Sequence, residues 1–210
     1  SGVGMNLSKI THSVYDILCQ SICAKECIYP TAFDNLHLIP SSPSLAGAEV
    51  ELAQIVSRET ILKQYSASIL EDYEYIIIDC PPSLSLLTLN AFCMSSKLII
   101  PVQCEYYALE GLAKLIETIN LIKQRLNPTL SIQGILLTMF DKRTLLNKQV
   151  VLEAKKYFNE LVFETIIPRN VRLAEAPSFG LPIALYEPNS IGSIAYYQLA
   201  KEVIHRANST

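Results

Sequence analysis

The stretch Tyr75-Ile76-Ile77-Ile78-Asp79-Cys80-Pro81-Pro82 decides how this chain is expected to fold. Four apolar residues lead to one carboxylate, and a continuous apolar run predicts a strand buried on both faces, as in a parallel sheet. The two prolines prevent further ladder pairing and turn the chain out of the sheet. Asp79 is therefore expected at the carboxyl end of a strand, where open α/β sheets bind their ligands.

Two roles are compatible with Asp79 at this position. A carboxylate at a strand tip has the form of a Walker-B acid, which holds Mg²⁺, often through water, in phosphate-binding enzymes. The alternative is an N-cap for the helix that follows the prolines. The stretch alone leaves both roles open.

Composition narrows the class of protein. The 210 residues are enough for one sizeable domain, and with 50% hydrophobic and 18% charged residues the chain suits a sheet covered by helices on both faces. The net charge of −3 creates no global positive field, so any contact with nucleic acid must come from a local patch. No apolar run reaches transmembrane length, no secretion signal opens the chain, and six scattered cysteines suit a reducing cytoplasm.

Strand-like and helix-like segments alternate along the chain, which predicts an α/β fold with a doubly wound, mostly parallel sheet and a single domain over 1–210. Besides 75–79, strands are expected over 35–39, 97–102, 132–139 and 162–167. Helices are expected over 14–18, 46–70, 84–94, 108–126, 148–161 and 190–206. The last helix is expected to pack through an apolar stripe of Ile194, Tyr197, Ala200 and Ile204.

Cysteine and histidine positions do not indicate a metal site. Cys19, Cys23 and Cys27 are spaced four apart, so they are able to line one helix face. Structural zinc sites usually need four ligands with closer paired spacing, and buried thiols are common, so we prefer a packing role. His37 alternates with apolar neighbours and is expected on a sheet face rather than in catalysis.

Four motifs together carry a family resemblance: YIIIDCPPSL (75–84), PVQCEYYALEG (101–111), IPRNVRLAEAPSFG (167–180) and LAGAEVEL (45–52). They closely resemble the ParA/Soj chromosome-partitioning ATPases in order and spacing, over essentially all 210 residues. The resemblance implies a deviant-Walker P-loop NTPase fold that uses ATP and Mg²⁺. It also implies a homodimer that forms with ATP, binds DNA without sequence preference, and hydrolyses ATP when a ParB/Spo0J-type partner stimulates it. Such a protein is cytoplasmic and nucleoid-associated, without stable membrane association.

The resemblance assigns roles to individual residues. Asp79 takes the Walker-B place, as the catalytic-site acid near Mg²⁺ through water, and Pro168, Arg169 and Asn170 fall on the loop that lies near the adenine. Arg143 and Arg172 fall where relatives carry basic residues that contact DNA. An exposed arginine is able to pair a phosphate at two points, although a solvated surface charge or an intrachain ion pair is the alternative.

A further motif, Glu105-Tyr106-Tyr107, follows a strand tip. In the family this segment lies near the place where the dimer face and the nucleotide meet. A purely structural role is an equally open alternative.

One part of the family pattern is missing from these 210 residues. The family begins with a strand, a Lys-Gly-Gly-Val-Gly-Lys-Thr-type loop, a helix and a second strand that ends in an acidic switch, a unit of roughly 30 or more residues. Gly2-Val3-Gly4 is no substitute, because no Lys-Ser/Thr follows it. We therefore expect an N-terminally truncated member that is inactive alone, with exposed ladder groups and an uncovered apolar face where that strand lies in the family.

Two other functions remain open. One is a truncated, non-catalytic paralogue that acts as an interaction or regulatory protein without affinity for ATP. The other is a membrane-placed relative of the MinD kind, which ends in a basic amphipathic helix. The last helix offers only Lys201, His205 and Arg206 for that purpose, so the sequence does not favour it. Whether the cargo is a chromosome or a plasmid is open as well.

Overall fold

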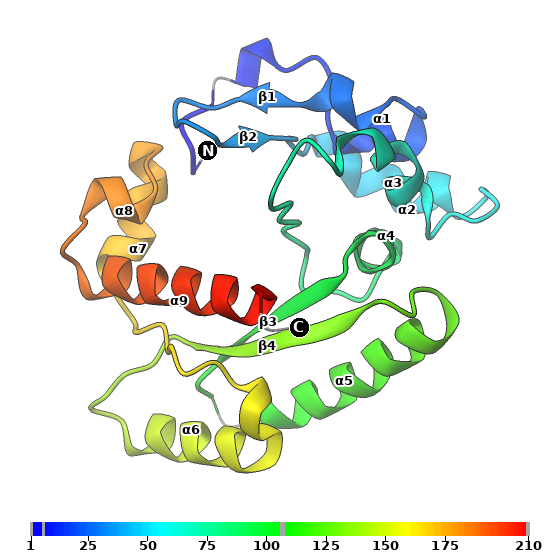
Figure 1. Ribbon diagram of the computed structural model, residues 1–210. Coiled ribbons are helices and arrows are strands. Elements are labelled where there is room, and N and C mark those ends of the chain that lie inside the picture. The colour runs from blue at the N-terminus through cyan, green and yellow to red at the C-terminus, as the bar shows by residue number, and fades with distance from the viewer. Residues whose placement is uncertain (1, 6, 106–107, 209–210) are drawn as a thin grey trace. The chain divides into compact units, whose positions relative to one another are not determined.

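The computed structural model describes residues 2–5, 7–105 and 108–208, which divide into two compact units. The C-terminal unit holds residues from Ser96 onward together with the first four positions, and the N-terminal unit holds Met5–Ser95. Figure 1 labels the helices and strands of both. Within the described ranges, no helix is both long enough and apolar enough to span a bilayer.

The C-terminal unit is built on a parallel strand pair. β3 (Lys97–Gln103) pairs with β4 (Ser131–Thr138), from Lys97 opposite Ser131 to Gln103 opposite Thr138, with a register shift between Leu98 and Ile99. The connection between them is α5 (Ala108–Arg125), whose buried Leu112, Ile119 and Ile122 follow the helical period. In Figure 1, α5 and α6 (Leu145–Phe158) lie on one face of this pair and α9 (Ile191–Asn208) on the other. The predicted α/β class with parallel pairing and helices on both faces is confirmed.

The strand predicted over 162–167 is reduced to isolated parallel bridges, Ile135 with Val162 and Phe140 with Pro168. Between these bridges, the Glu202 carboxylate of α9 accepts hydrogen bonds from the backbone amides of Glu164, at 2.9 Å, and Thr165, at 3.0 Å. Burial opposes ionisation of Glu202, but the hydrogen bonds from the two amides, together with the Thr165 side chain and the charge of Arg206, outweigh it and lower the pKa of this side chain. Because these amides point to α9, they are not available for a regular ladder.

The packing stripe predicted on the last helix is wrong. Ile194 is 48% exposed and Tyr197 65%, whereas the buried face of α9 carries Gly192, Ser193, Ala195 and Leu199. Small residues let the helix approach its neighbours closely, and a Cβ at Gly192 would clash with the side chain of Leu173. The buried face of α9 is therefore the one whose small side chains allow close packing. The spacing of large apolar residues along the sequence does not reveal this face.

Gly134 has a similar role inside the sheet. It lies in β4 immediately after the register shift, and a Cβ there would clash with the ring of Phe163, which is fully buried. Phe163 packs in a core cluster with Leu136, Ile167, Ala195 and Leu199. Because Gly134 has no side chain, it leaves the space that the ring of Phe163 occupies.

Short elements complete the C-terminal unit. They are η5 (Asn159–Leu161), α7 (Val171–Glu175), η6 (Ala176–Phe179) and α8 (Ile183–Tyr186). Gly180 ends η6 in the left-handed region, at φ 67°, which glycine adopts without strain.

The N-terminal unit consists of short elements. Its helices are α1 (Val14–Cys19), α2 (Ala48–Leu52), α3 (Ile61–Tyr65) and α4 (Leu86–Met94), with 3₁₀ turns η1 (Leu7–Lys9), η2 (Ala24–Cys27), η3 (Pro43–Gly47) and η4 (Ala67–Ile69). β1 (Tyr29–Pro30) and β2 (His37–Leu38) pair antiparallel. The core contains Ile17, Cys27, Ala48, Leu52 and Ile69.

Two expectations for this unit are corrected. The single helix predicted over 46–70 is wrong, because the chain turns between α2 and α3, with Ser57 in the left-handed region at φ 58°. The three spaced cysteines do not share a helix, since Cys19 ends α1 and Cys27 ends η2. Among the described residues, no group of three or more His, Cys, Asp or Glu side chains is placed to hold a metal ion.

The apolar stretch that ends at Asp79 does not form the strand predicted for it. Residues 75–79 belong to no strand of the described chain, and Ile77 is 91% exposed, so the predicted buried strand is wrong. Ile78 packs against the core of the N-terminal unit, while Ile76 and Ile77 find no cover there. A buried strand needs ladder partners on its edges, and no described segment pairs with this one. The expectation of an uncovered apolar face stays a prediction.

Candidate functional site

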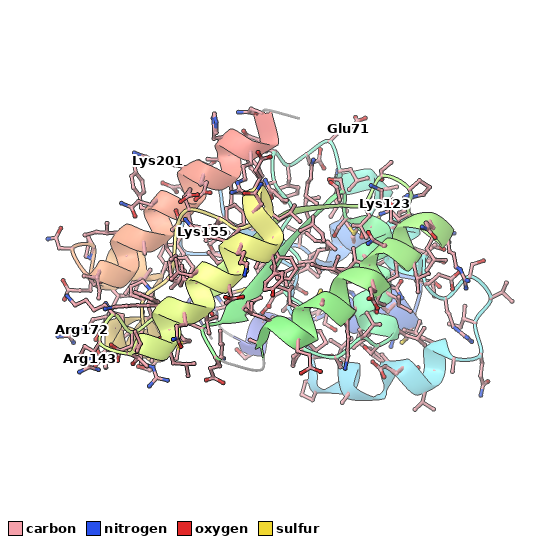
Figure 2. All side chains as sticks on the ribbon, turned by 90° about the horizontal axis from the view of Figure 1, so that it is seen from below. Glu71, Lys123, Arg143, Lys155, Arg172 and Lys201 are labelled. Carbon is pink, nitrogen blue, oxygen red and sulfur yellow. The ribbon has the colours of Figure 1, made fainter. Side chains whose placement is uncertain are left out.

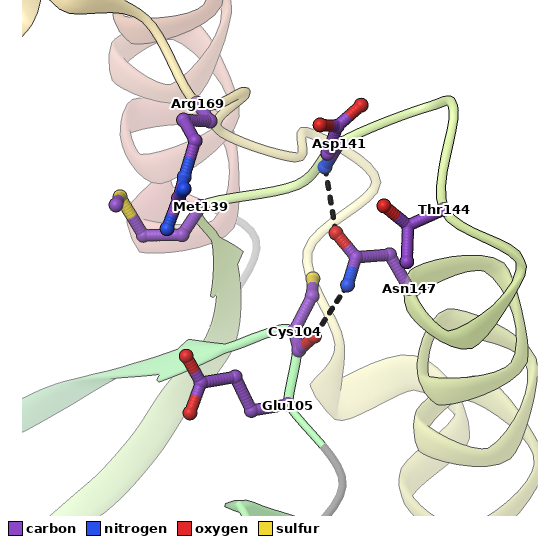
Figure 3. Close-up of a pocket in the computed structure, with 7 residues that line it drawn as sticks. All are labelled: Cys104, Glu105, Met139, Asp141, Thr144, Asn147 and Arg169. Atoms are coloured by element: carbon purple, nitrogen blue, oxygen red, sulfur yellow. Dashed lines mark hydrogen bonds between the residues drawn. The ribbon is translucent and has the colours of Figure 1, made fainter.

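A pocket of about 170 Å³ lies where β3 and β4 end, within the C-terminal unit. Figure 3 shows the seven residues that line it: Cys104, Glu105, Met139, Asp141, Thr144, Asn147 and Arg169. They come from the loop after β3, the loop after β4, the first turn of α6 and the loop after 162–167. The carboxyl ends of parallel strands are the usual ligand-binding edge of an α/β sheet, so this is the candidate site.

Asn147 joins two walls of the pocket. Its side-chain Nδ2 donates to the Cys104 carbonyl at 2.7 Å, and its Oδ1 accepts from the Asp141 amide at 2.7 Å (Figure 3). The first bond spans 43 residues of sequence. The amide of one side chain thereby fixes the loop after β3 against the loop after β4.

Met139 has an unusual backbone in the pocket wall. Its φ is 56°, in the left-handed region that non-glycine residues seldom occupy, and it follows β4 directly. Such conformations persist where the surroundings impose them, and they concentrate at functional sites. The strained backbone of Met139 lies directly at the end of β4, which supports the pocket at this edge as a functional site.

The charges of the pocket are those of Glu105, Asp141 and Arg169. The Asp141 carboxylate is engaged by Arg143, whose Nε lies 3.0 Å from Oδ1 and whose Nη2 lies 2.7 Å from Oδ2. The Arg143 guanidinium, followed by the Arg143 backbone amide at 3.0 Å, holds the pKa of Asp141 far below its usual range. Asp141 is therefore an ionised group whose acceptor sites are largely used outside the pocket.

Of the three residues assigned to the adenine loop, Arg169 alone lines the pocket. Its backbone amide donates to the Phe140 carbonyl at 2.9 Å, next to the bridge between Phe140 and Pro168. Asn170 uses its Oδ1 to accept from the Arg172 amide at 2.8 Å, as the N-cap of α7. The loop is held by backbone bonds to the end of β4, and only the Arg169 side chain is presented to the pocket.

The two arginines assigned to DNA are exposed and each pairs with a carboxylate. Arg143 is bound by Asp141 as described, and Arg172 Nη1 contacts Glu175 Oε2 at 2.8 Å. The hydrogen bond to Glu175 raises the pKa of Arg172, as that to Asp141 raises the pKa of Arg143. Figure 2 shows both arginines at the same end of the C-terminal unit in that view. The alternative of an intrachain ion pair is thus realised at both positions, without excluding a contact with DNA.

Asp79 lies in the N-terminal unit and is exposed at the end of segment 75–79. The N-cap alternative is wrong, because Ser85 is the N-cap of α4. Mg²⁺ usually binds one or two protein carboxylates and fills its other positions with water and phosphate oxygens. An accessible single carboxylate fits that requirement.

The pocket of the C-terminal unit suits part of a nucleotide rather than a whole one. Its volume is below the roughly 300–1,000 Å³ typical of sites for larger ligands. The planar guanidinium of Arg169 is suited to stack on a base or to bind a phosphate. These 210 residues contain no Gly-rich loop with a following Lys-Ser/Thr, so they offer no phosphate cradle of that kind.

Sequence reasoning missed several lining residues: Cys104, Met139, Asp141, Thr144 and Asn147. Met139 is the last residue of a predicted strand, and Cys104 and Asp141 closely follow predicted strands, so the rule for strand tips was sufficient to nominate these two loops. Thr144 and Asn147 lie farther on, at the start of α6. Glu105 of the Glu105-Tyr106-Tyr107 motif lines the pocket, and the two tyrosines lie outside the described residues. A larger depression of about 390 Å³ lies near the end of α5, away from the strand tips. Lys123 is the one charged residue among the described residues that line it, so the smaller pocket is the better candidate for a functional site.

Comparison with known proteins gives close relatives over nearly the whole chain. A family model described as "AAA domain" matches residues 1–132. The chain is 52% identical over 203 residues to the sporulation initiation inhibitor protein Soj of Bacillus subtilis, covering 97% of this chain and 80% of that protein. It is 50% identical over 206 residues to the chromosome partitioning protein ParA of Myxococcus xanthus, covering 98% and 73%.

Solved structures share the architecture. A cobyrinic acid a,c-diamide synthase from Mycobacterium smegmatis, solved with ADP and magnesium, has a TM-score of 0.81 at 32% identity and covers 99% of this chain and 77% of its own. The cell division ATPase MinD of Pyrococcus furiosus has a TM-score of 0.78 at 22% identity, with 97% and 79% covered, and supports the fold alone.

Proposed function

The chain belongs to the Soj/ParA family of chromosome-partitioning ATPases, and on that premise we propose that the full-length protein binds ATP with Mg²⁺, dimerises and segregates DNA. The observation that carries the proposal is the 52% identity to Soj over 97% of the chain. The pocket at the ends of β3 and β4 is consistent with it, because this is the edge at which such sheets bind ligands.

Arg169, with Pro168 and Asn170 holding its loop, is proposed to contact the adenine end of the nucleotide. The support is its position in the pocket and the backbone bonds that fix the loop to Phe140. Arg169→Ala should weaken the binding of ATP in calorimetry by roughly 10-fold, as expected when a charge-assisted or stacking contact is lost. Lys142→Ala, an exposed cation outside the pocket lining, is the matched control. Equal affinities for both variants would remove Arg169 from the nucleotide site.

Asp79 is proposed to hold Mg²⁺ through water. Bound Mg²⁺ supplies positive charge to the phosphates during hydrolysis, and the part of the chain is to position it. Asp79→Ala in the full-length protein should reduce ATP turnover by about 100-fold or more, while thermal unfolding stays unchanged because the side chain is exposed. Asp34→Ala removes another exposed carboxylate of the same unit and should retain turnover. Survival of turnover in Asp79→Ala would refute the assignment.

Arg143 and Arg172 are proposed to contact DNA phosphates without reading sequence. Both guanidinium groups are exposed on the C-terminal unit, with side chains 84% and 52% accessible. Arg143→Ala and Arg172→Ala should each weaken binding to all duplex sequences alike and reduce the slope of log K against log salt by about 1. An unchanged slope in both variants would place these residues off the DNA surface.

The remaining family properties are proposals of the same standing: a homodimer, a ParB/Spo0J-type partner that stimulates hydrolysis, and a cytoplasmic, nucleoid-associated location. A fluorescent fusion of the full-length protein should overlap the nucleoid in cells. It should lose that pattern when Arg143 and Arg172 are both replaced by alanine. A membrane-bound fusion would contradict the proposed location.

A further inference from the structure

Asp141 and Arg143 form a closed arrangement within one loop. The guanidinium approaches both carboxylate oxygens, with Nε at 3.0 and 3.3 Å and Nη2 at 2.7 Å, and the Arg143 backbone amide also donates to Oδ1 at 3.0 Å. The carboxylate is therefore held at two points by the planar fork of the arginine. That fork is the same surface with which an arginine binds two oxygens of a phosphate.

Asp141 also belongs to the pocket. Its backbone amide donates to Asn147, which is bound in turn to the carbonyl of Cys104 at the end of β3. One residue thus has its amide in the wall of the candidate nucleotide site and its carboxylate on the arginine assigned to DNA. Its backbone is fixed from the pocket side, and its side chain holds Arg143 from the other.

The second arginine is held less firmly. Arg172 makes a single hydrogen bond to Glu175, through Nη1 at 2.8 Å, and Glu175 Oε2 also accepts from the Tyr186 hydroxyl at 3.3 Å. No backbone amide of Arg172 shares this carboxylate, because its amide donates to Asn170 instead. Of the two arginines, Arg143 is therefore the one whose carboxylate partner contacts the guanidinium at two points and also accepts from its backbone amide.

We propose that Asp141 masks Arg143, so that its carboxylate occupies the guanidinium fork in place of a DNA phosphate until the loop rearranges. The proposal rests on the proposed DNA-binding function and adds a residue that limits it. Exposed ion pairs are weak, since water and salt screen them, so a phosphate is able to displace the carboxylate. The masking residue lies two positions from the arginine and is always present, whereas the phosphate must arrive from solution.

The test measures affinity of the full-length protein, with ATP and Mg²⁺, for random-sequence duplex DNA over a series of salt concentrations. Asp141→Asn keeps the backbone amide and the shape of the side chain but removes the charge that masks Arg143. We expect binding about 3- to 10-fold tighter, and a log–log salt slope steeper by about 1 as one further phosphate is neutralised. Asp141→Ser, which keeps a short acceptor for the Arg143 amide, should give the same direction if the first variant folds poorly.

Two controls separate masking from a general change of charge. Glu117→Gln removes an exposed carboxylate from α5 and should change affinity by less than about 2-fold. In an Arg143→Ala background, Asp141→Asn should lose most of its gain, because there is no arginine to release. An equal gain with and without Arg143, or no gain at all, would overturn the masking role.

Failure of the proposed function has a different signature. If neither the wild type nor Asp141→Asn binds duplex DNA, the DNA-binding function is refuted and masking falls with it. If only Asp141→Asn binds, masking is supported in its strongest form. Binding by both proteins with no dependence on Arg143 refutes masking while leaving the function intact.

Discussion

Residues 75–79 and β3 (Lys97–Gln103) are both apolar runs that end in a polar residue, yet they differ in strand pairing and in the exposure of their side chains. β3 pairs with β4 along its length, and its Ile100 and Val102 are each 7% exposed. The other run pairs with no described segment, and its Ile77 is 91% exposed. An apolar run favours the β conformation. It becomes a strand of a sheet only where a neighbouring segment offers free backbone N–H and C=O groups for hydrogen bonding.

The same contrast separates the two units. In the C-terminal unit, parallel pairing brings three loops together at one edge and creates a pocket. In the N-terminal unit, the strands are two residues long and the core is closed by short helices. The unit with the regular strand pair is therefore the one in which loops far apart in sequence share a site.

Matched truncations in the two runs test this contrast most strongly. Ile100→Ala should lower the free energy of unfolding by about 2–5 kcal/mol, because it leaves a cavity in a buried strand. Ile77→Ala should change it by less than about 0.5 kcal/mol, because that side chain is already in water. Urea denaturation of both variants measures the difference. Similar losses would mean that Ile77 is covered in solution.

A smaller effect is expected from adding a methyl group beside the strand pair. Gly134→Ala should destabilise the protein by about 1–3 kcal/mol, because the new Cβ would meet the buried ring of Phe163. Gly111→Ala in α5 has open space around it and should be neutral or stabilise by up to about 1 kcal/mol. If both changes were stabilising in urea denaturation, the packing of Phe163 on Gly134 would be refuted.

The bridge between the strand tips gives a still smaller expectation. Asn147→Ala should destabilise the C-terminal unit by about 1–2 kcal/mol, since two hydrogen bonds are lost beside an open pocket that admits water. Hydrogen exchange at the Asp141 amide should accelerate in this variant. Gln149→Ala removes an exposed amide from the same helix and should leave that exchange unchanged. Exchange that stays slow in Asn147→Ala would contradict the bridge.

The two runs are each followed by a cysteine, and these should differ in reactivity. Burial raises the pKa of Cys104 to about 11, and burial followed by the charge of Asp79 raises that of the more accessible Cys80. Because the thiolate is the nucleophile and Cys104 is 1% exposed, iodoacetamide at pH 8 should alkylate Cys80 at least roughly 10-fold faster. Peptide mass spectrometry measures both rates, and equal rates would show that β3 opens readily.

Cys104 also gives a pH dependence with a defined sign. An unfolded cysteine ionises near 8.5, whereas folded Cys104 ionises at about 11. Between these values the native state binds more protons than the unfolded state, so stability falls as the pH rises. Cys104→Ala should remove its part of this alkaline loss in denaturation curves. A loss that is unchanged in this variant would assign the effect to other groups.

Sequence reasoning succeeded where the pattern is local. The helices α5 and α9 and the strands β3 and β4 were predicted nearly to their ends, because helical periodicity and apolar runs bounded by polar loops are visible within one segment. It failed where packing chose among local options, as on α9, where small residues rather than Ile194 and Tyr197 face the interior. The roles of Asp79, Pro168, Arg169, Asn170, Arg143 and Arg172 stay predictions that the experiments above are designed to test.

The sequence by itself determined the fold class, the family and the identity of the acids and arginines assigned to function, because those depend on residue type and order along the chain. The tertiary structure decided which apolar run obtained a partner and which asparagine joined the strand tips. Those outcomes depend on backbone groups and side chains meeting across tens of residues, as Asn147 and Cys104 do. Contacts of that kind form only after the chain has folded and are not encoded in any single segment.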